Sequence, residues 1–549
     1  MKEMILKELS PYLDNASITD CADGSVAVRV PDADTRMFLR FGDRLSAEGW
    51  MCVRNRDRMK TRFATYKRDG ISLLASFTRD EGVIRLLYDI SGRIPPFDDK
   101  YEVVTTPLVT QVRPLYYGVD CGMTYVIRLS DGRFVIIDGS LGEHGEMEHL
   151  YDILISQNVR DTKPTVAAWF ITHAHSDHFG GFVKFFREYK DKVSIERLMY
   201  NWPSRELCNM GHDVTPFDEI AASLPKVAVI TPHTGQVYKF ADASFEILFA
   251  CEDLYPEFIK NFNDTSIIMR MTLGKHRIIW LGDAMKTASN LVAKRFAEEE
   301  LASDILQVGH HGYSGGSDAL NRAVDPSLLL WPCPDFWFHV VRLWPANQYL
   351  ISSEKIFATY VSGREETVLD LSVEDLSSSG VTNTRDGTLP YAEDFSHGLV
   401  RKLHWTCITG GSTGYRPAKI EISDGECRLE TAEAYTVCEL RQPWQTEGFD
   451  GFEMTLSGRV EKKGEVKLFC DYASPTVYSE EKAIELPLPE SGEFTLRVSA
   501  DRKSGKVKLS LDGRETGDAP YVPEERNGIY LIMKETVITL NALKIEPRA

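Results

Sequence analysis

Short apolar runs that end in polar residues recur through the middle of the chain. Residues 166–171 form one such run, which predicts a buried strand. Beyond the polar stretch that follows, Gly180 and Gly181 precede aromatic and aliphatic residues at 182–186, a pattern typical of a helix packed on that strand. The polar residues 172–179 are therefore predicted to lie on a loop between a strand and a helix.

A hairpin is predicted just before this strand. Residues 123–129 and residues 133–137 are β-rich runs, and the Asp131-Gly132 sequence between them is typical of a hairpin turn. The second run ends at Asp138. An acid at the end of one strand carries little information by itself, so its meaning depends on what lies at the ends of the other strands.

Two later runs repeat this form. Residues 276–281 make a strand-like run that is followed, after one glycine, by Asp283. Residues 304–308 make another, which leads into a Gly-His-His-Gly sequence that contains His310 and His311. The middle of the chain is thus predicted to carry His and Asp side chains at the ends of several strands.

The chain on either side of this middle part also has strand-like alternation. The N-terminal part combines a short helix with β-rich runs and ends at Pro95 and Pro96. The C-terminal part has alternating runs bounded by Gly, Asp and Ser turns, which is typical of an antiparallel sandwich, and residues 377–380 are the expected hinge before it. The runs are 25–30, 37–41, 71–77 and 83–88 in the first part, and 452–456, 466–470, 494–498, 507–511 and 529–533 in the second.

The length and net charge of the chain limit its domain number and its possible substrates. With 549 residues, 43% of them hydrophobic, the chain can build more than one core, and we expect domains at residues 1–95, 106–380 and 385–549. The net charge is −18. Because nucleic acid is held chiefly by Lys and Arg, this charge makes long nucleic acid an unfavourable partner and favours a small-molecule substrate.

Targeting and redox signals are weak in this sequence. The first residues carry acids and lack an apolar core of signal-peptide length, and no stretch approaches the roughly 20 apolar residues of a spanning helix. We therefore expect a cytoplasmic protein without a membrane span. The 10 cysteines show no CxxC spacing, which favours reduced thiols over a zinc ribbon or a disulfide framework.

The predicted loop at residues 172–179 concentrates metal-binding side chains. His173, His175, Asp177 and His178 lie close together in it, although the whole chain has only 13 histidines. His173 and His175 can reach one cation, while Asp177 and His178 can reach a second cation beside it. Imidazole combined with carboxylate suits zinc, manganese or iron. The pattern predicts two divalent metal ions, with zinc preferred.

This HxHxDH motif resembles the second motif of the metallo-β-lactamase superfamily, and the resemblance extends over about residues 106–380. It implies an αββα sandwich core, so the expected fold class is α+β, with a small α+β N-terminal domain and a C-terminal antiparallel β-sandwich. It also makes Asp138 a group that fixes ligand orientation, Asp283 the carboxylate that bridges both metals, and His310 the last ligand.

One ligand departs from the superfamily pattern. A third His usually completes the first metal site, but Asn263 stands in the corresponding segment. Asn263 would offer an amide oxygen or leave room for water. Cys251, at the end of another predicted strand, is an alternative ligand, although a small buried thiol is the more ordinary interpretation. The segment itself resembles the hydrolase domain of bacterial DNA-uptake channel proteins and the choline-phosphate esterases.

The motifs and the resemblance together predict metal-dependent hydrolysis. Asp177 is expected to orient the attacking water, and His311 or Tyr313 to donate to the leaving group or the oxyanion. With Asp rather than Cys at the bridging position, the site resembles the superfamily's phosphodiesterases, nucleases and lactonases more than its zinc β-lactamases. The predicted substrate is a phosphodiester or another small ester. The alternative is a binding or scaffold protein that keeps the fold with weak catalysis.

Three further features carry less information. His212 lies in a segment where this fold often builds its substrate rim, so it is a candidate for a functional role. The C-terminal part resembles lectin-like jelly rolls in outline, which makes carbohydrate contact or homo-oligomer formation an expectation there. A group of aromatic residues after the last motif either lines a pocket or packs in the core. These residues are Trp331, Phe336, Trp337, Phe338 and Trp344.

Overall fold

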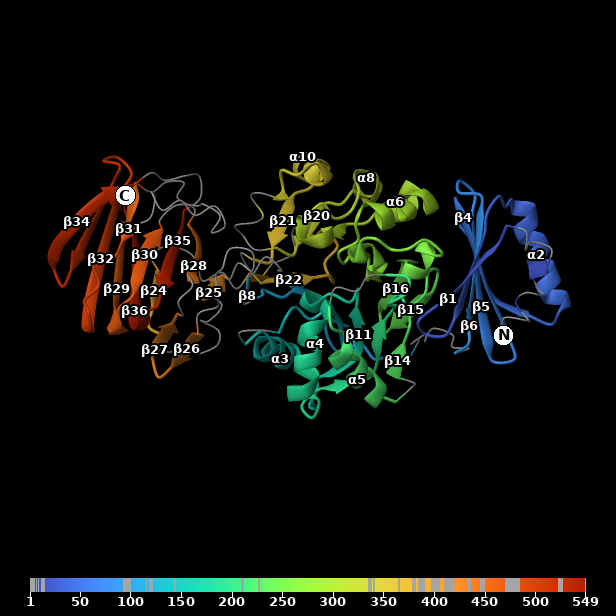
Figure 1. Cartoon of the computed structure of the whole chain (residues 1–549), viewed down its shortest axis with the longest axis horizontal. Helices are drawn as coiled ribbons and strands as arrows, with labels where there is room; N and C mark the ends of the chain where they lie inside the picture. Colours follow the sequence, from blue (N-terminus) through green and yellow to red (C-terminus); the bar gives the residue numbers. More distant parts are fainter. Residues whose placement is uncertain are drawn as a thin grey trace.

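The computed structural model consists of three parts along its long axis (Figure 1). The N-terminal part is a sheet with a helix, the central part holds two sheets between helices, and the C-terminal part holds two further sheets. The predicted breaks at Pro95 and Pro96 and at residues 378–380 lie outside the described residues. The structure describes residues 5, 7, 9, 10, 15–91, 100–114, 116–117, 122–142, 145–208, 212–225, 228–333, 338, 341–363, 366–377, 382–383, 391–395, 405–408, 419–431, 436–444, 450–469, 484–521 and 527–548.

Six antiparallel strands form the N-terminal sheet, in the order β1-β2-β6-β5-β4-β3. One face carries the helix α2, with which it shares a hydrophobic core. The opposite face lies against the central part, and its Ala27, Leu74 and Leu87 join a core of that part (Figure 1). The elements are β1 (Ser17–Asp20), β2 (Val26–Val30), α2 (Thr35–Ala47), β3 (Met51–Asp57), β4 (Thr61–Arg68), β5 (Ile71–Thr78) and β6 (Val83–Asp89).

The sequence prediction was wrong for residues 37–41, which lie in α2 and not in a β-rich run. The Asp34 carboxylate accepts a hydrogen bond of 2.7 Å from a backbone N–H in the first turn and so caps the helix. Phe38, Phe41 and Leu45 are buried along one side, the spacing of an amphipathic helix. The apolar period over the whole segment therefore outweighs the strand preference of a few aromatic residues.

Two sheets packed face to face form the middle of the central part, with one hydrophobic core between them. The first follows the order β14-β13-β11-β10-β9-β7-β22-β23, with β12 beside β11, and the second runs from β15 to β21 in chain order. The first sheet contains β7 (Leu108–Gln111), β9 (Tyr125–Arg128), β10 (Phe134–Ile137), β11 (Thr165–Ile171), β12 (Ser194–Ile195), β13 (Leu198–Tyr200), β14 (Val229–Ile230), β22 (Thr367–Asp370) and β23 (Thr382–Asn383). The second contains β15 (Val237–Phe240), β16 (Ala243–Phe249), β17 (Ile268–Leu273), β18 (His276–Trp280), β19 (Ile305–Gln307), β20 (Leu328–Trp331) and β21 (Ala358–Val361).

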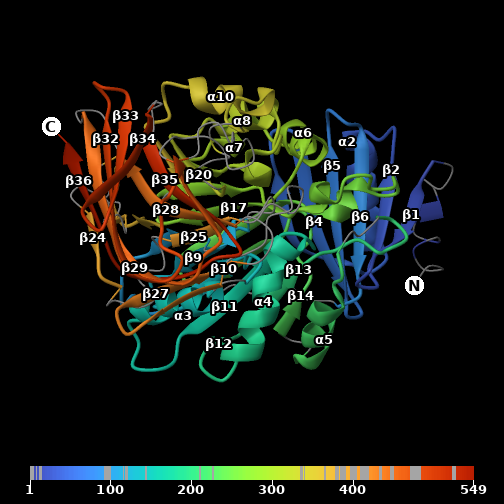
Figure 2. The same ribbon diagram turned by 60° about the vertical axis from the view of Figure 1, so that its left-hand side comes forward.

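Helices cover the outer faces of both central sheets, as Figures 1 and 2 show from two directions. The helices α3, α4 and α5 share a core with the first sheet, and α6 and α8 share one with the second. The four layers agree with the αββα core expected from the sequence. The helices are α3 (Glu146–Gln157), α4 (Ser176–Tyr189), α5 (Thr215–Ser223), α6 (Lys286–Arg295), α7 (Glu298–Leu301), α8 (Asp318–Val324), α10 (Gln348–Ser352) and the 3-10 turns η3 (Cys251–Leu254), η4 (Phe262–Thr265), η5 (Gly309–Gly312) and η6 (Pro345–Asn347).

The C-terminal strands, together with the short strand β8 from the central part of the sequence, form two sheets that share one hydrophobic core. One has the order β26-β27-β36-β29-β32-β33-β34, with β24 beside β36, and the other has the order β31-β30-β35-β28-β25-β8. Runs expected from the sequence at 452–456, 494–498 and 507–511 lie within β29, β32 and β33. The strands are β8 (Tyr116–Tyr117), β24 (Tyr391–Glu393), β25 (Trp405–Ile408), β26 (Lys419–Ser423), β27 (Glu426–Glu430), β28 (Thr436–Trp444), β29 (Gly451–Lys462), β30 (Glu465–Phe469), β31 (Ile484–Glu485), β32 (Gly492–Asp501), β33 (Lys506–Leu511), β34 (Arg514–Pro520), β35 (Asn527–Lys534) and β36 (Val537–Arg548).

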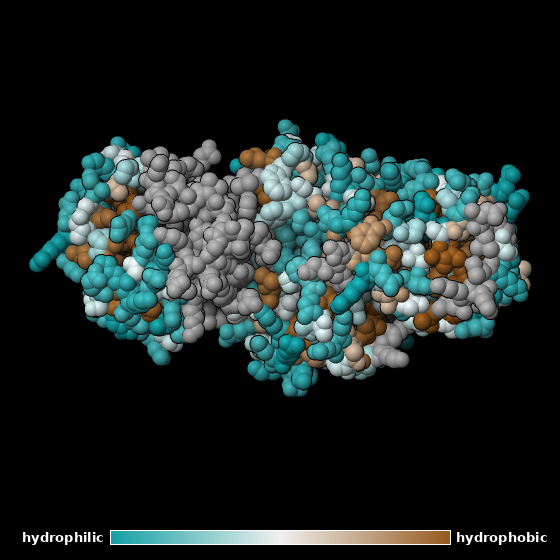
Figure 3. Space-filling view, viewed as in Figure 1, coloured by the Kyte–Doolittle hydropathy of each residue, from teal (hydrophilic) through white to brown (hydrophobic). Residues whose placement is uncertain are grey.

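The surface is mixed in character. Figure 3 shows hydrophilic residues over much of the coloured surface, interspersed with smaller apolar areas. This distribution fits a chain in which 26% of the residues are charged. Within the described part of the chain, no helix is both long enough and apolar enough to span a membrane.

Candidate metal centre

Loops that follow four strands bring the predicted site residues together. Asp138 follows β10, residues 173–178 follow β11, Asp283 follows β18, and residues 310–311 follow β19. In the first sheet β10 pairs in parallel with β11, and in the second β18 pairs in parallel with β19. The loops that follow the two strands of each pair therefore leave their sheet at the same edge. The two edges face each other across the central core, which places side chains distant in sequence side by side.

Asp138 is completely buried and hydrogen bonds to the first residue after β11, where the predicted metal-binding segment begins. Its Oδ1 accepts from the backbone N–H of Thr172 (2.7 Å), and its Oδ2 accepts from the Thr172 hydroxyl (2.8 Å) and from Nδ1 of His178 (2.8 Å). Burial raises the pKa of Asp138, and the neighbouring His178 offsets part of that effect. Because Asp138 engages Nδ1, the other ring nitrogen of His178 faces the remaining acids.

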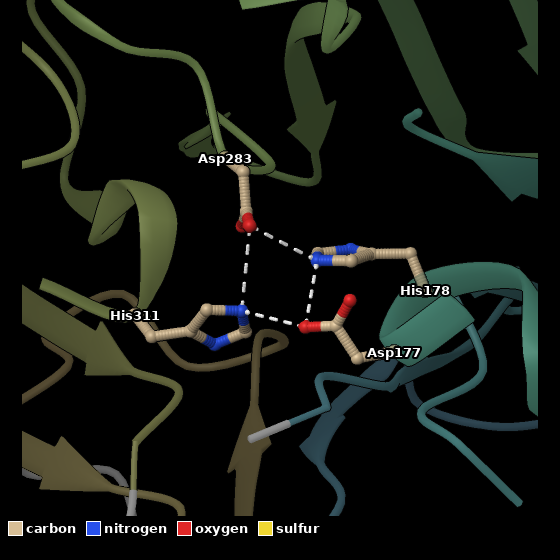
Figure 4. Close-up of side chains that lie close together, drawn as sticks. All are labelled: Asp177, His178, Asp283 and His311. Atoms are coloured by element: carbon tan, nitrogen blue, oxygen red, sulfur yellow. Dashed lines mark ion pairs between the residues drawn. The ribbon is translucent and has the colours of Figure 1, made fainter. Parts of the chain in front are cut away.

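Four side chains from three loops converge into the first ligand group, made of Asp177, His178, Asp283 and His311 (Figure 4). One ligand atom from each lies within 4.8 Å of all the others. Nε2 of His178 lies 3.2 Å from Oδ2 of Asp283 and 3.6 Å from Oδ2 of Asp177. Nε2 of His311 lies 3.4 Å from each of the same two oxygens. All four residues are buried.

A second ligand group shares one carboxylate with the first. It consists of His173, His175 and Asp283, again with ligand atoms within 4.8 Å of one another. Nε2 of His173 lies 3.8 Å from Oδ2 of Asp283, and the His173 and His175 ring centroids are 4.6 Å apart. Burial lowers the pKa of His173 well below its usual range and lowers that of His175 to about 4. Both imidazoles are therefore neutral near pH 7 and can offer a lone pair.

The charge balance of these groups fits divalent cations. Burial acts to raise the pKa of Asp177 and Asp283, but His178 and His311 outweigh it, so both carboxyls stay ionised. Among the described residues, no Lys or Arg forms an ion pair with either carboxylate. Nε2 of His173 and Oδ1 of Asp283 are buried without a hydrogen-bond partner. Buried polar atoms of this kind need a partner, and a metal ion supplies one.

The tight turn η5 decides which histidine of the His310-His311 pair faces the acids. Both residues have left-handed backbone conformations, with φ of 48° and 53°. Nδ1 of His311 donates to the carbonyl oxygen of Pro332 (2.7 Å), which directs Nε2 toward the first ligand group. Nε2 of His310 lies 4.0 Å from Asp283 Oδ2, and His310 belongs to neither group. The resemblance had implied His310 as the ligand, whereas the structure brings His311 among the ligand atoms.

Asn263 lies beside the second group, on the turn η4. Its Nδ2 donates to Nε2 of His310 (3.1 Å), whose Nδ1 donates to the carbonyl oxygen of Tyr313 (2.7 Å). The neighbouring Phe262 ring lies 5.2 Å from the His175 ring, between centroids. The buried Oδ1 of Asn263 has no hydrogen-bond partner. The Asn263 amide N–H therefore engages the Nε2 lone pair of His310, while its amide oxygen, close to the second group, accepts no hydrogen bond.

Three other candidates have different surroundings. His212 lies against His175, with ring centroids 4.7 Å apart, and its Nδ1 is 3.0 Å from the hydroxyl of Ser176. Cys251 is buried outside both ligand groups, where its thiol donates to Oδ1 of Asn201 (3.3 Å), and burial raises its pKa. The ring of Tyr313 lies 6.4 Å from that of His311, between centroids.

Among the aromatic residues after the last motif, Trp331 and Phe338 lie in the core. Trp331 is fully buried, and its indole N–H donates to the carbonyl oxygen of His311 (3.1 Å), so it supports the turn from below. Phe338 packs edge-on against it with ring centroids 5.0 Å apart, and Trp344 packs against Tyr313. Phe336 and Trp337 lie outside the described residues.

Two polar residues that the sequence analysis left without a role support Asp283. Oε1 of Gln307 accepts from the backbone N–H groups of Leu281 and Gly282, both at 2.8 Å. The hydroxyl of Ser266 accepts from the backbone N–H of Asp283 (3.1 Å). Gln307 is completely buried. A lone polar residue inside an otherwise apolar strand run is the signal that identifies it.

The sequence around these ligand groups matches a known family. The family model described as metallo-beta-lactamase superfamily matches residues 118–326. The central domain belongs to the metallo-β-lactamase superfamily. Members of this superfamily typically bind divalent metals and are commonly hydrolases, and the buried His and Asp cluster lies within the matched segment or next to it. The resemblance to particular branches of the superfamily stays a prediction. No curated protein matches the chain.

Several solved structures are similar to part of this chain. A protein of unknown function with a galectin-like fold from Bacillus subtilis has 15% identity and a TM-score of 0.22, covering 29% of this chain and 96% of that one. The Emp46p carbohydrate recognition domain has 14% identity and a TM-score of 0.19, covering 27% and 89%. A Lotus tetragonolobus seed lectin has 9% identity and a TM-score of 0.20, covering 26% and 93%. TM-scores of this size support no conclusion, so carbohydrate contact or self-association stays a prediction.

Proposed function

We propose that the central domain is a dinuclear-metal-dependent hydrolase that acts on a phosphodiester or another small ester. The observation that carries this proposal is the position of Asp283, which among the described residues is the member shared by both ligand groups. A shared carboxylate between two clusters of imidazole and carboxylate is what a pair of neighbouring divalent ions requires.

Each proposed ion has its own donor set. His173, His175 and Asp283 would hold the first, and Asp177, His178, Asp283 and His311 the second. The mixture of imidazoles and carboxylates suits zinc best, with manganese or iron as the alternatives. When bound, such ions supply Lewis acidity and lower the pKa of a water molecule.

The protein's own contribution is orientation and charge. Asp138 fixes the ring of His178 through Nδ1, and Pro332 fixes that of His311 in the same way. Asp177 stays ionised because His178 and His311 lower its pKa, so it can orient an attacking water by accepting a hydrogen bond from it. Tyr313, beside the two histidines of η5, is the proposed donor to a leaving oxygen.

The chain's charge supports a small substrate. At a net charge of −18, long polyanions are repelled unless a local basic groove compensates, which leaves short phosphodiesters, lactones and other small esters as the favoured class. Among these we place phosphodiesters first, because the segment around Asn263 resembles that of the choline-phosphate esterases.

Metal content and turnover measured on one preparation test the proposal. Protein purified without chelator should contain about two transition-metal equivalents per chain and hydrolyse bis(p-nitrophenyl) phosphate. Removal of the metals should abolish turnover, and added zinc or manganese should restore it. A metal content near zero that neither metal raises would contradict the proposal.

A second candidate function is a binding or scaffold protein with weak catalysis. The observation in its favour is Asn263, which stands where the superfamily supplies a third His and which donates to His310. A protein that retains two metals and fails to turn over any small ester would fit this candidate and not the hydrolase.

Position 263 also gives a prediction about how tightly the protein retains its metals. In the variant Asn263→His, an imidazole replaces the amide and can add a third nitrogen donor to the first ion. We expect metal loss during dialysis against a mild chelator to slow by at least about tenfold, the lower range for groups that merely support a ligand. Asn55→His, on the exposed strand β3, is the control and should leave the rate unchanged. Faster metal loss from Asn263→His would show that position 263 does not face the first ion.

A further inference from the structure

A pocket lies between the N-terminal sheet and the central domain, apart from the metal ligands. The sheet face turned away from α2 forms one wall, and residues of η3 and of the loop before β15 form the other. Tyr255 from η3 and Phe63 from β4 line it together with His233. The pocket therefore exists only because the two parts are docked.

One row of side chains across the sheet is polar and carries two positive charges. Strand register places Ser17 opposite Arg29, Arg29 opposite Arg85, and Arg85 opposite Ser76. All four residues line the pocket. Like charges directly opposite each other on neighbouring strands destabilise a sheet. An arginine pair at this position is therefore unfavourable unless negative charge lies close by.

The acids of the opposite wall are already committed to other partners. Asp253 accepts from Arg295 (2.5 Å) and from the hydroxyl of Thr234 (2.6 Å). Glu252 accepts from Asn201 (2.8 Å) and lies 3.3 Å from Nδ1 of His233. Burial acts to lower the pKa of His233, but Glu252 and Asp23 outweigh it and raise the pKa to about 10. The negative charges of Asp253 and Glu252 are thus balanced by Arg295 and His233.

The arginine pair is only partly neutralised. Arg85 donates from Nη1 to Glu81 (2.6 Å), but its Nε is buried without a hydrogen-bond partner and lies 3.9 Å from Asp253. Burial lowers the pKa of Arg85, and nearby Arg295 adds to the effect. Within the described part of the chain, the Arg29 side chain has no hydrogen bond and no ion pair. One positive charge on this wall therefore lacks a counterion.

The next row of the same sheet face is apolar. Ala27, Leu87 and Leu74 stand opposite one another on β2, β6 and β5, and all three line the pocket. The ring of Phe63 on β4 closes the end of the polar row beyond Ser76. The pocket thus offers a cationic and hydroxyl-bearing row beside a hydrophobic one, the usual composition of a small-molecule site.

We propose that this pocket binds a small molecule with an anionic headgroup and an apolar body. The headgroup, a phosphoryl or carboxylate group, lies between Arg29 and Arg85 with the Ser17 and Ser76 hydroxyls beside it. The apolar body lies over the row formed by Ala27, Leu87 and Leu74. Such a ligand supplies the missing negative charge and touches both parts of the chain, so it stabilises their docking.

Calorimetric titration of the metal-loaded full chain tests the site with two probes, phenylphosphonate and benzoate. The two probes share the apolar ring and differ in headgroup, and neither can be hydrolysed. We expect at least one to bind, and Arg29→Gln to weaken that binding by at least about tenfold, the range for a charged hydrogen bond. Arg40→Gln is the matched control, because Arg40 is an exposed arginine on α2, behind the other face of the same sheet.

Each outcome decides the proposal. Tighter binding of phenylphosphonate identifies a phosphoryl ligand, and tighter binding of benzoate a carboxylate ligand. Ser17→Asp, which sets a carboxylate opposite Arg29, should weaken the same probe without removing either arginine. Binding that survives both Arg29→Gln and Ser17→Asp belongs to the metal centre and overturns the proposal. Absence of binding by both probes at millimolar concentration overturns it as well.

Discussion

Asp283→Asn is expected to abolish turnover and to lower the metal content of the protein. Its Oδ2 lies within 4.0 Å of Nε2 in His173, His178, His310 and His311, and it is the member common to both ligand groups. An amide keeps the shape of the side chain but removes the negative charge that two cations would share. We expect the rate to fall by more than about a thousandfold, roughly 4 kcal/mol in the barrier.

The measurement is turnover of bis(p-nitrophenyl) phosphate together with elemental analysis of the purified variant. Asp69→Asn is the control, because the Asp69 side chain is 89% exposed in a turn of the N-terminal sheet. Both variants should show the unfolding transition of the parent protein or one close to it. Parental activity and metal content in Asp283→Asn would mean that another carboxylate bridges the ions, and the proposed arrangement would have to be abandoned.

Much of the central fold was predictable because its signals are local. The apolar runs expected at 166–171, 276–281 and 304–308 correspond to β11, β18 and β19. Strands buried on both faces need continuous apolar sequence, so their ends are marked by the first polar residue. For the same reason Asp138 and Asp283 stood out as polar residues at strand ends, and the resemblance to the metallo-β-lactamase superfamily gave them their expected roles.

Features that depend on contacts between distant segments were not predictable. Arg29 and Arg85 are opposite each other because β2 pairs with β6, and nothing in either strand indicates that partner. The helix at residues 37–41 was missed for a related reason, since its apolar side becomes clear only against the sheet that it covers. Periodicity gives the element, but the packing partner decides which face and which neighbours it has.

The His310-His311 pair shows the same limit within the site. Sequence places both residues after β19, but their consecutive left-handed conformations turn one ring toward the acids and the other toward Asn263. The turn is held by tertiary contacts, among them the hydrogen bond from the backbone N–H of His310 to the carbonyl oxygen of Gly282 (3.0 Å). A sequence pattern that contains two adjacent histidines cannot distinguish these orientations.

The two histidines therefore give a matched pair of variants. His311→Ala removes a ligand from the second proposed ion, so we expect metal content to fall to about one equivalent and turnover to fall by more than about a thousandfold. His310→Ala removes a ring that hydrogen bonds to Asn263 and Tyr313 outside both ligand groups. It should retain both metals and keep turnover within about tenfold of the parent, roughly 1.4 kcal/mol.

Each variant is the control for the other, because the same change is made at adjacent positions of one turn. Metal analysis separates loss of a ligand from loss of a proton donor, since a donor variant would keep both ions while its rate fell. If His310→Ala loses metal and activity and His311→Ala keeps both, the ligand assignment has to be exchanged between the two positions. If both variants lose the metals and also unfold earlier than the parent, η5 is a structural support of the centre as a whole, and neither ring can be assigned as a ligand from activity alone.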